Sequence, residues 1–176
     1  DSESYTYIYG HVVVAAARMR AEGESFEAIA AVVRSRLKRC EAILGVYSLK
    51  HLKKSGRISG GAAFVGEALG LRPLSLVRAG AVTVTEKVRG DKNVVPAMVA
   101  LVKKNAVNPV QQTAGLLYGD VSEERIQELE RLLLNECGFA AVERCPIGVS
   151  VITNTGPLAL AVAYYGTPRD GGPAAP

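Results

Sequence analysis

Two arginines stand where predicted secondary-structure elements end. Arg57 follows the turn Ser55-Gly56 after a short basic helical stretch, and Arg89 closes a predicted strand just before Gly90. Arginine suits carboxylates and phosphates, because its planar guanidinium donates two parallel hydrogen bonds. The ends of strands and helices are also where α/β proteins commonly bind ligands. The pattern therefore favours an anion-binding site.

A third polar segment adds hydrogen-bonding groups to this candidate site. Asn154 and Thr155 open the sequence Asn-Thr-Gly-Pro, which follows a run predicted as a strand. Each segment also has a purely structural interpretation: Arg57 could bond the last carbonyls of a helix, Arg89 could be solvated, and 154–157 could be only a turn. The combination of the three segments favours ligand binding.

Other chemistries find little support in the sequence. His11 and His51 lie in no serine-nucleophile motif, and residues 55–61 lack the lysine and glycine spacing of a phosphate loop. The cysteines, at positions 40, 137 and 145, have no spacing typical of zinc ligands or a disulfide framework. We therefore predict no catalytic residue, metal or cofactor, and a binding protein in preference to an enzyme.

The composition is that of one globular domain. Of 176 residues, 48% are hydrophobic and 22% charged. The net charge of +4 comes from 21 Lys and Arg against 17 Asp and Glu without a polybasic block, so no nucleic-acid partner is predicted. The absence of a long apolar run and of a signal peptide, with three cysteines expected to be reduced, predicts a cytoplasmic protein with at most transient membrane contact. Because the first residue is Asp1, we expect a piece of a longer polypeptide.

The first half of the chain predicts two helices, a strand and a basic helical turn. An alanine-rich helix spans 12–21, and Ser25 can cap a second helix whose apolar residues recur at helical spacing as far as Leu37. A strand over 42–47 and a helical turn over 49–54 follow.

A hairpin is predicted next, with strands 74–77 and 82–89 around Ala79-Gly80. Strand side chains alternate between the two faces of a sheet. One face is then expected to hold Thr83, Thr85, Lys87 and Arg89, and the other Val82, Val84 and Val88. The alternation therefore directs the Lys87 and Arg89 cations the same way.

The second half alternates helices with short strands. A helix capped by Asn93 has Pro96 in its first turn, and Ser122 caps another. Strands are predicted over 116–118, 141–145, 149–153 and 158–165. The predicted fold is an α/β layered sandwich on a mixed sheet. We expect one domain over 1–165, led by a helical segment over 1–40, and a flexible Gly/Pro-rich tail over 166–176.

Five short motifs, in order, resemble the DegV family. The family's Leu-x-x-Leu-Lys-x-Gly-Gly-Arg-Ile resembles 49–58, its Ile-Lys-Pro-Ile resembles 71–74, its Asp-Gly turn resembles 79–80, its Lys-x-Arg resembles 87–89, and its His-Thr-Gly-Pro-Gly resembles 154–158. The resemblance extends from Asp1 to about Tyr165. Three positions depart from the pattern: Ser55 and Leu158 replace glycines, and Asn154 replaces the histidine.

The resemblance implies the C-terminal lobe of a two-lobed α/β fold that encloses a fatty acid between its lobes. It implies an acyl carrier that holds the fatty acid for a separate fatty-acid kinase subunit. The implied partners are thus a fatty acid, that kinase subunit and the N-terminal lobe of the same protein. Arg57, Arg89 and Asn154 would surround the carboxylate, with Thr155 beside it. A phosphotransferase of related fold and a basic interaction module remain as alternatives.

Overall fold

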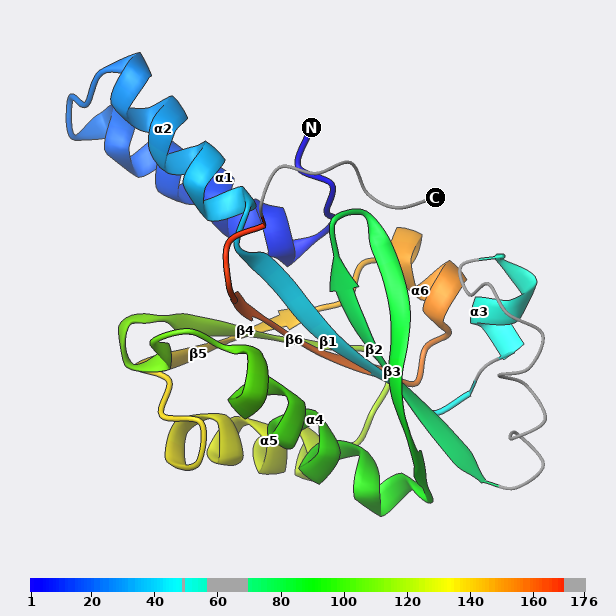
Figure 1. Cartoon of the computed structure of the whole chain (residues 1–176). Helices are drawn as coiled ribbons and strands as arrows, with labels where there is room; N and C mark the ends of the chain where they lie inside the picture. Colours follow the sequence, from blue (N-terminus) through cyan, green and yellow to red (C-terminus); the bar gives the residue numbers. More distant parts are fainter. Residues whose placement is uncertain (49, 57–69, 170–176) are drawn as a thin grey trace.

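The computed structural model describes residues 1–48, 50–56 and 70–169. It is built around a six-stranded mixed sheet with helices on both faces, which confirms the predicted α/β class (Figure 1). The strand order is β3-β2-β1-β6-β4-β5, and only β4 and β5 run parallel among these neighbours. The strands are β1 (Cys40–Val46), β2 (Leu71–Arg78), β3 (Ala81–Arg89), β4 (Thr113–Tyr118), β5 (Ala141–Pro146) and β6 (Ala159–Tyr165).

Two groups of helices cover the two faces of the sheet. One face packs against α4 (Val94–Asn105) and α5 (Glu123–Asn135), and the other against α1 (Tyr7–Ala21), α3 (Lys50–Lys54) and α6 (Val149–Thr155). Helix α2 (Phe26–Leu37) lies alongside α1 and projects with it from the body (Figure 1). The short helices η3 (Asp91–Asn93) and η4 (Pro109–Gln111) flank α4. We call the second surface the α6 face.

Local signals explain several elements directly. The Ser25 hydroxyl accepts a hydrogen bond from the Ala28 N–H at 3.2 Å, which confirms the predicted cap of α2. Ile126, Leu129 and Leu133 form the buried stripe of α5. Asn93 precedes α4 as expected, but its amide donates to the Arg89 carbonyl at 2.7 Å instead of capping the helix. The chain's first helix starts at Tyr7, earlier than the alanine-rich run indicated.

The hairpin forms as predicted, but a β-bulge changes its faces. Glu86 lies opposite Leu74 and Val84 opposite Ser75, so Thr85 is an extra residue in β3. Its hydroxyl donates to the Leu74 carbonyl at 3.3 Å. The predicted faces are therefore wrong on one side of the bulge: Val82 packs on the α6 face, whereas Val88 packs on the α4 face.

The predicted strand over 149–153 is wrong, because these residues form helix α6. Its β-branched residues favour a strand by propensity. Val151, Ile152 and Thr155, however, lie on one side of a helix and pack toward the sheet. This packing overrides the local preference.

Hydrogen bonds connect the segment after β6 to the end of α2. The Gly166 N–H donates to the Arg39 carbonyl at 2.8 Å, and Arg169 bonds the carbonyls of Leu37 and Lys38. The division into a domain over 1–165 and a tail over 166–176 stays a prediction. Within the described ranges, no helix combines the length and the apolar character needed to cross a membrane.

Candidate ligand-binding site

Three of the segments predicted to bind a ligand lie at the same end of the sheet, where β1 and β3 end and β2 and β6 begin. We call this end of the strands the polar edge of the sheet. Arg89 ends β3 opposite Leu71, the first residue of β2, while Val46 ends β1 opposite Ala159, the first residue of β6. Helix α3 follows β1, and α6 precedes β6. The two helices pack against each other at this edge (Figure 1). Antiparallel pairing thus brings together residues more than sixty positions apart in the sequence.

Arg89 is exposed at the end of β3. By register it shares the α6 face with Lys87, because these residues lie opposite Leu71 and Pro73 on the same side of β2 as Val77. The prediction that Lys87 and Arg89 point the same way is therefore confirmed. Among the described residues, the Arg89 guanidinium has no hydrogen bond or ion pair, so it is available to an anion.

Asn154 and Thr155 are the last two residues of α6, and both use hydrogen-bonding groups within the helix. The Asn154 amide donates to the Ser150 carbonyl at 2.8 Å. Thr155 is 5% exposed, and its hydroxyl lies 3.2 Å from the Val151 carbonyl and 3.0 Å from that of Gly156. Thr155 is therefore set in place by the helix. One Asn154 N–H is already engaged.

Arg57, the fourth predicted site residue, lies outside the described residues. Two neighbours in its motif, Leu49 and Ile58, also lie outside them. The described part of that segment is α3, which ends at Lys54 and is followed by Ser55-Gly56. The structure thus brings Arg89, Asn154 and Thr155 to one sheet edge.

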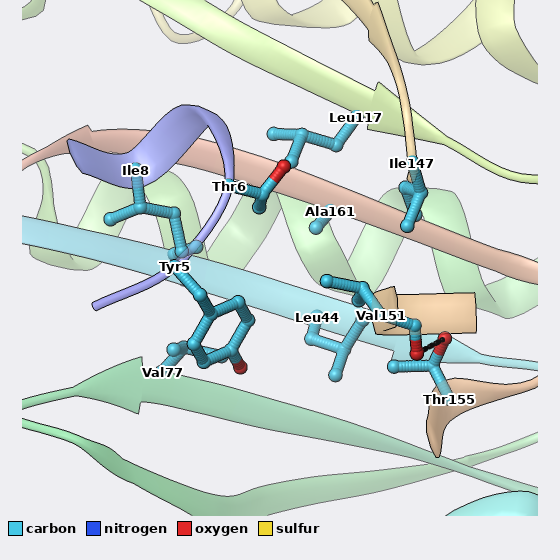
Figure 2. A pocket seen from close by; sticks show the side chains of 11 residues that line it. Tyr5, Thr6, Ile8, Leu44, Val77, Leu117, Ile147, Val151, Thr155 and Ala161 are labelled. Atoms are coloured by element: carbon cyan, nitrogen blue, oxygen red, sulfur yellow. Dashed lines mark hydrogen bonds between the residues drawn. The ribbon is translucent and has the colours of Figure 1, made fainter. Parts of the chain in front are cut away.

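An apolar cavity extends from Thr155 along the α6 face (Figure 2). The space between its walls is about 330 Å³ when the adjoining open solvent is included, of which about 20 Å³ can hold a water-sized molecule. Ala42 and Leu44 of β1 line it together with Ala161 of β6, and Val151 and Thr155 of α6 lie at one end (Figure 2). Tyr5, Thr6 and Ile8 line the opposite end. The cavity therefore joins the predicted polar edge to the beginning of the chain.

The sequence did not indicate the lining at the beginning of the chain. Tyr5 and Thr6 precede α1, and no motif distinguishes them from other surface residues. Val151 lay in a segment predicted as a strand, where its direction could not be inferred correctly. An apolar lining has no local signature, because the same residue types fill a dry core.

A half-buried polar network holds α1 over the same face of the sheet. His11 Nε2 lies 2.6 Å from the Tyr165 hydroxyl, and its Nδ1 lies 2.8 Å from the Tyr7 carbonyl. Because the carbonyl can only accept, Nδ1 carries the proton and Nε2 accepts from Tyr165. Burial lowers the pKa of His11 and raises the pKa of Tyr165 to about 12. The network therefore favours neutral groups.

Metal chemistry has no support in the part of the chain that the structure describes, which contains no group of three or more His, Cys, Asp or Glu side chains able to hold an ion. Cys40 and Cys137 are buried, and burial raises their pKa values to about 11. These thiols are therefore poor nucleophiles. The arrangement fits the binding of an amphipathic anion better than covalent chemistry.

Comparisons with known proteins identify the family of the chain. The family model described as "Uncharacterised protein, DegV family" matches residues 1–167. A DegV domain-containing protein of Caldanaerobacter subterraneus subsp. tengcongensis is 30% identical over 164 residues, which are 93% of this chain and 58% of that protein. The chain thus spans less than two thirds of that relative.

Solved structures show the same fold. A fatty-acid-binding DegV family protein from Thermus thermophilus superposes with a TM-score of 0.82 at 24% identity, over 95% of this chain and 60% of that one. The fatty acid kinase B3 protein of Streptococcus pneumoniae, loaded with linoleic acid, gives a TM-score of 0.80 at 20% identity, over 95% and 59%. On the match over residues 1–167, this chain belongs to the DegV family.

Proposed function

We propose that this chain binds a long-chain fatty acid, with the carboxylate at the sheet edge and the acyl chain along the α6 face. Arg57 and Arg89 supply the cations, and Asn154 and Thr155 supply hydrogen-bonding groups beside them. The observation that carries the proposal is the apolar cavity with Thr155 at one end. It lies on the same face of the sheet as Arg89.

A fatty acid has an apolar tail and an ionised head group, which fit the apolar cavity and the cationic polar edge respectively. Burial contributes about 0.8 kcal/mol per CH₂, so a long acyl chain gains roughly 12 kcal/mol gross from an apolar environment. A carboxylate that leaves water without a partner loses much of this gain. An arginine without a partner in the described residues is therefore the group needed at the polar end.

The relatives support the chemical class of the ligand. The matched Thermus thermophilus protein binds fatty acid, and a DegV family protein from Eubacterium eligens is loaded with heptadecanoic acid. The matched fatty acid kinase protein carries linoleic acid. These ligands differ in length and unsaturation but share an ionised head and an apolar tail. That common chemistry is what we assign to this chain.

We further propose that the protein is a carrier for a separate kinase subunit and not itself a kinase. The described residues include no group of three or more His, Cys, Asp or Glu side chains that could hold a metal ion for phosphoryl transfer. An N-terminal lobe of the same protein would cover the carboxylate and complete its hydrogen bonds. The arginines would then hold the head group and steady negative charge during phosphoryl transfer by the partner.

Calorimetric titration of the full-length protein with a long-chain fatty acid tests this function. Arg89→Ala is expected to weaken binding about tenfold or more, because it removes a charge-assisted hydrogen bond. Lys87→Ala, on the same face two residues earlier, serves as the matched control and is expected to change the affinity less than Arg89→Ala. Equal affinities for the wild type and Arg89→Ala would remove Arg89 from the site.

A further inference from the structure

His51 lies at the junction of α3 and α6. It is half-buried on α3, next to Leu52, which is 1% exposed and anchors this short helix to the α6 face. No role was predicted for His51, because it lies in no catalytic motif. Its position in the fold, however, brings the imidazole against the segment that contains Thr155.

The Nδ1 atom of His51 is buried against Gly156. A Cβ built on Gly156 would lie 2.7 Å from this nitrogen, so the glycine hydrogen in that direction points toward it. Nδ1 has no hydrogen-bond partner among the described residues. An N–H on Nδ1 would point at the Gly156 C–H group, where it would have no acceptor and would be repelled. A lone pair on Nδ1 would instead make a weak favourable contact with that C–H group. The contact therefore favours a lone pair on Nδ1 and the donor N–H on Nε2.

The Nε2 atom is the free end of the ring. It is not among the buried orphan atoms, and no hydrogen bond joins it to any residue that the structure describes. Helices α3 and α6 carry no acidic residue, while α3 carries Lys50, Lys53 and Lys54. Neither helix therefore supplies a carboxylate of its own for the Nε2 proton.

The position of the ring relates it to the candidate site. Gly156 follows Thr155, which lines the apolar cavity at the α6 end. Gly156 is also buried and has φ +83, so the chain turns here directly under the imidazole. A ligand whose tail occupied the cavity would have its head group near this turn.

We propose that His51 is a further ligand-binding residue, which donates a hydrogen bond from Nε2 to a carboxylate oxygen of the fatty acid. The proposal rests on the function proposed above and adds a second kind of donor to the arginines. It also predicts selectivity: a ligand with a charged carboxylate gains more from this donor than the corresponding alcohol, because hydrogen bonds to ionised groups are stronger.

The test compares three variants of the full-length protein. His51→Phe keeps a planar ring but removes the donor, His51→Gln keeps an N–H donor, and Lys50→Ala changes an exposed neighbour on the same helix. Calorimetry measures the affinity of each for octadecanoate and for octadecanol. We expect His51→Phe to weaken octadecanoate about tenfold or more, and octadecanol much less. His51→Gln should recover part of the loss, and Lys50→Ala should resemble the wild type.

Nitrogen NMR of the His51 imidazole provides a second test, which compares the wild-type protein with and without ligand. The His51 spectrum should show the Nε2–H tautomer, and its Nε2 signal should shift when octadecanoate is added but much less with octadecanol. Unchanged octadecanoate binding by His51→Phe would overturn the proposal while leaving the binding function intact. Equal losses for acid and alcohol would also overturn it. A wild-type protein that bound no fatty acid would contradict both proposals.

Discussion

His51 Nδ1 and Gly156 are in such close contact that no side chain fits between them. A Cβ at Gly156 would lie 2.7 Å from Nδ1 and 3.2 Å from the ring's Cγ. The contact joins α3 to the end of α6, the two helices at the polar edge of the sheet. The geometry of the candidate site therefore depends on a glycine at position 156.

Replacing Gly156 with Ala should lower the free energy of unfolding by about 1–3 kcal/mol. Two effects combine: the new Cβ collides with the His51 ring, and φ of +83 is unfavourable for any residue with a side chain. Urea denaturation measures the change. The double variant Gly156→Ala with His51→Ala should recover only the part due to the collision.

Gly10→Ala is the matched control for this substitution. Gly10 lies within α1, and a Cβ there meets nothing within 4 Å. Alanine should therefore stabilise the protein by about 0.5–1 kcal/mol, because it favours the helix. A Gly156→Ala protein as stable as the wild type would show that His51 does not press on Gly156.

The ion pair between the buried Glu41 carboxylate and Arg78 should make the stability effect of replacing Arg78 depend on pH. Glu41 is 3% exposed, and its Oε1 lies 3.0 Å from Arg78 Nη1. Burial raises the pKa of Glu41, and Arg78 opposes that rise. Arg78→Met should lower the free energy of unfolding at neutral pH by about 2 kcal/mol, because it leaves the carboxylate without its cation.

The sign of this effect follows from the raised pKa of Glu41. Such a group contributes stability below its unfolded pKa, and the contribution is lost as the pH rises through the folded pKa. The deficit of Arg78→Met should therefore shrink as the pH is lowered through the raised pKa of Glu41, because the carboxyl group of the variant then takes up a proton. Adding Glu41→Gln should remove this dependence on pH.

The control is Lys103→Met, because Lys103 forms an exposed ion pair with Glu136. This variant should change the free energy of unfolding by less than about 0.5 kcal/mol.

The lowered pKa of His11 should make the protein less stable in mild acid. Burial lowers its pKa below the ordinary value of 6.5, and the nearby Arg36 lowers it further, while the bond to the Tyr7 carbonyl and the charge of Glu143 act in the opposite direction. A group with a depressed pKa contributes stability above its unfolded pKa and loses it as the pH falls through the folded pKa. Protonation would also remove the acceptor for the Tyr165 hydroxyl.

The wild type should therefore lose more stability than His11→Gln between about pH 7.5 and pH 5.5. Urea midpoints at several pH values measure the difference, since the carboxylates that titrate in both proteins cancel. Parallel pH curves for the two proteins would show that His11 is not held as a neutral ring.

Ala161→Leu should shorten the path available to an acyl chain. Ala161 lines the cavity from β6, and a leucine there adds three carbons. Displacing about three methylenes costs about 2 kcal/mol, or roughly 30-fold in affinity, for a ligand that fills the cavity. Octadecanoate should lose affinity while octanoate changes little.

Ala163→Leu is the matched control, because Ala163 packs on the same face of β6 but does not line the cavity. It tests whether overpacking alone reduces binding. Equal losses of octadecanoate affinity in the two variants would contradict the proposed path of the acyl chain.

Strong local patterns made much of the fold predictable from the sequence. The amphipathic α5, the capped α2 and the Ala79-Gly80 hairpin all form near their predicted positions. Face assignments in β3 failed at Thr85, because alternation assumes an unbroken register and a bulge leaves no clear mark in the sequence. The strand predicted at α6 failed because β-branched residues can also pack as a short helix against a sheet.

Local patterns indicated which polar residues could form a site, but not the tertiary contacts around them. Arg89 ends a strand as predicted, whereas Asn154 and Thr155 end helix α6 where a strand had been predicted before them, and Asn154 already donates to Ser150. The cavity lining from Tyr5 and the approach of His51 to Gly156 arise only when distant segments pack together. Single-residue patterns carry no information on such contacts.

The most direct test of the central proposal is organic extraction of the purified full-length protein, followed by mass spectrometry of the extract. A protein incubated with long-chain fatty acid and then washed should release it in amounts stoichiometric with the polypeptide. Arg89→Ala should retain less than Lys87→Ala. A correctly folded wild-type protein that yields a lipid-free extract, both as purified from several hosts and after incubation, would contradict fatty-acid binding by this chain.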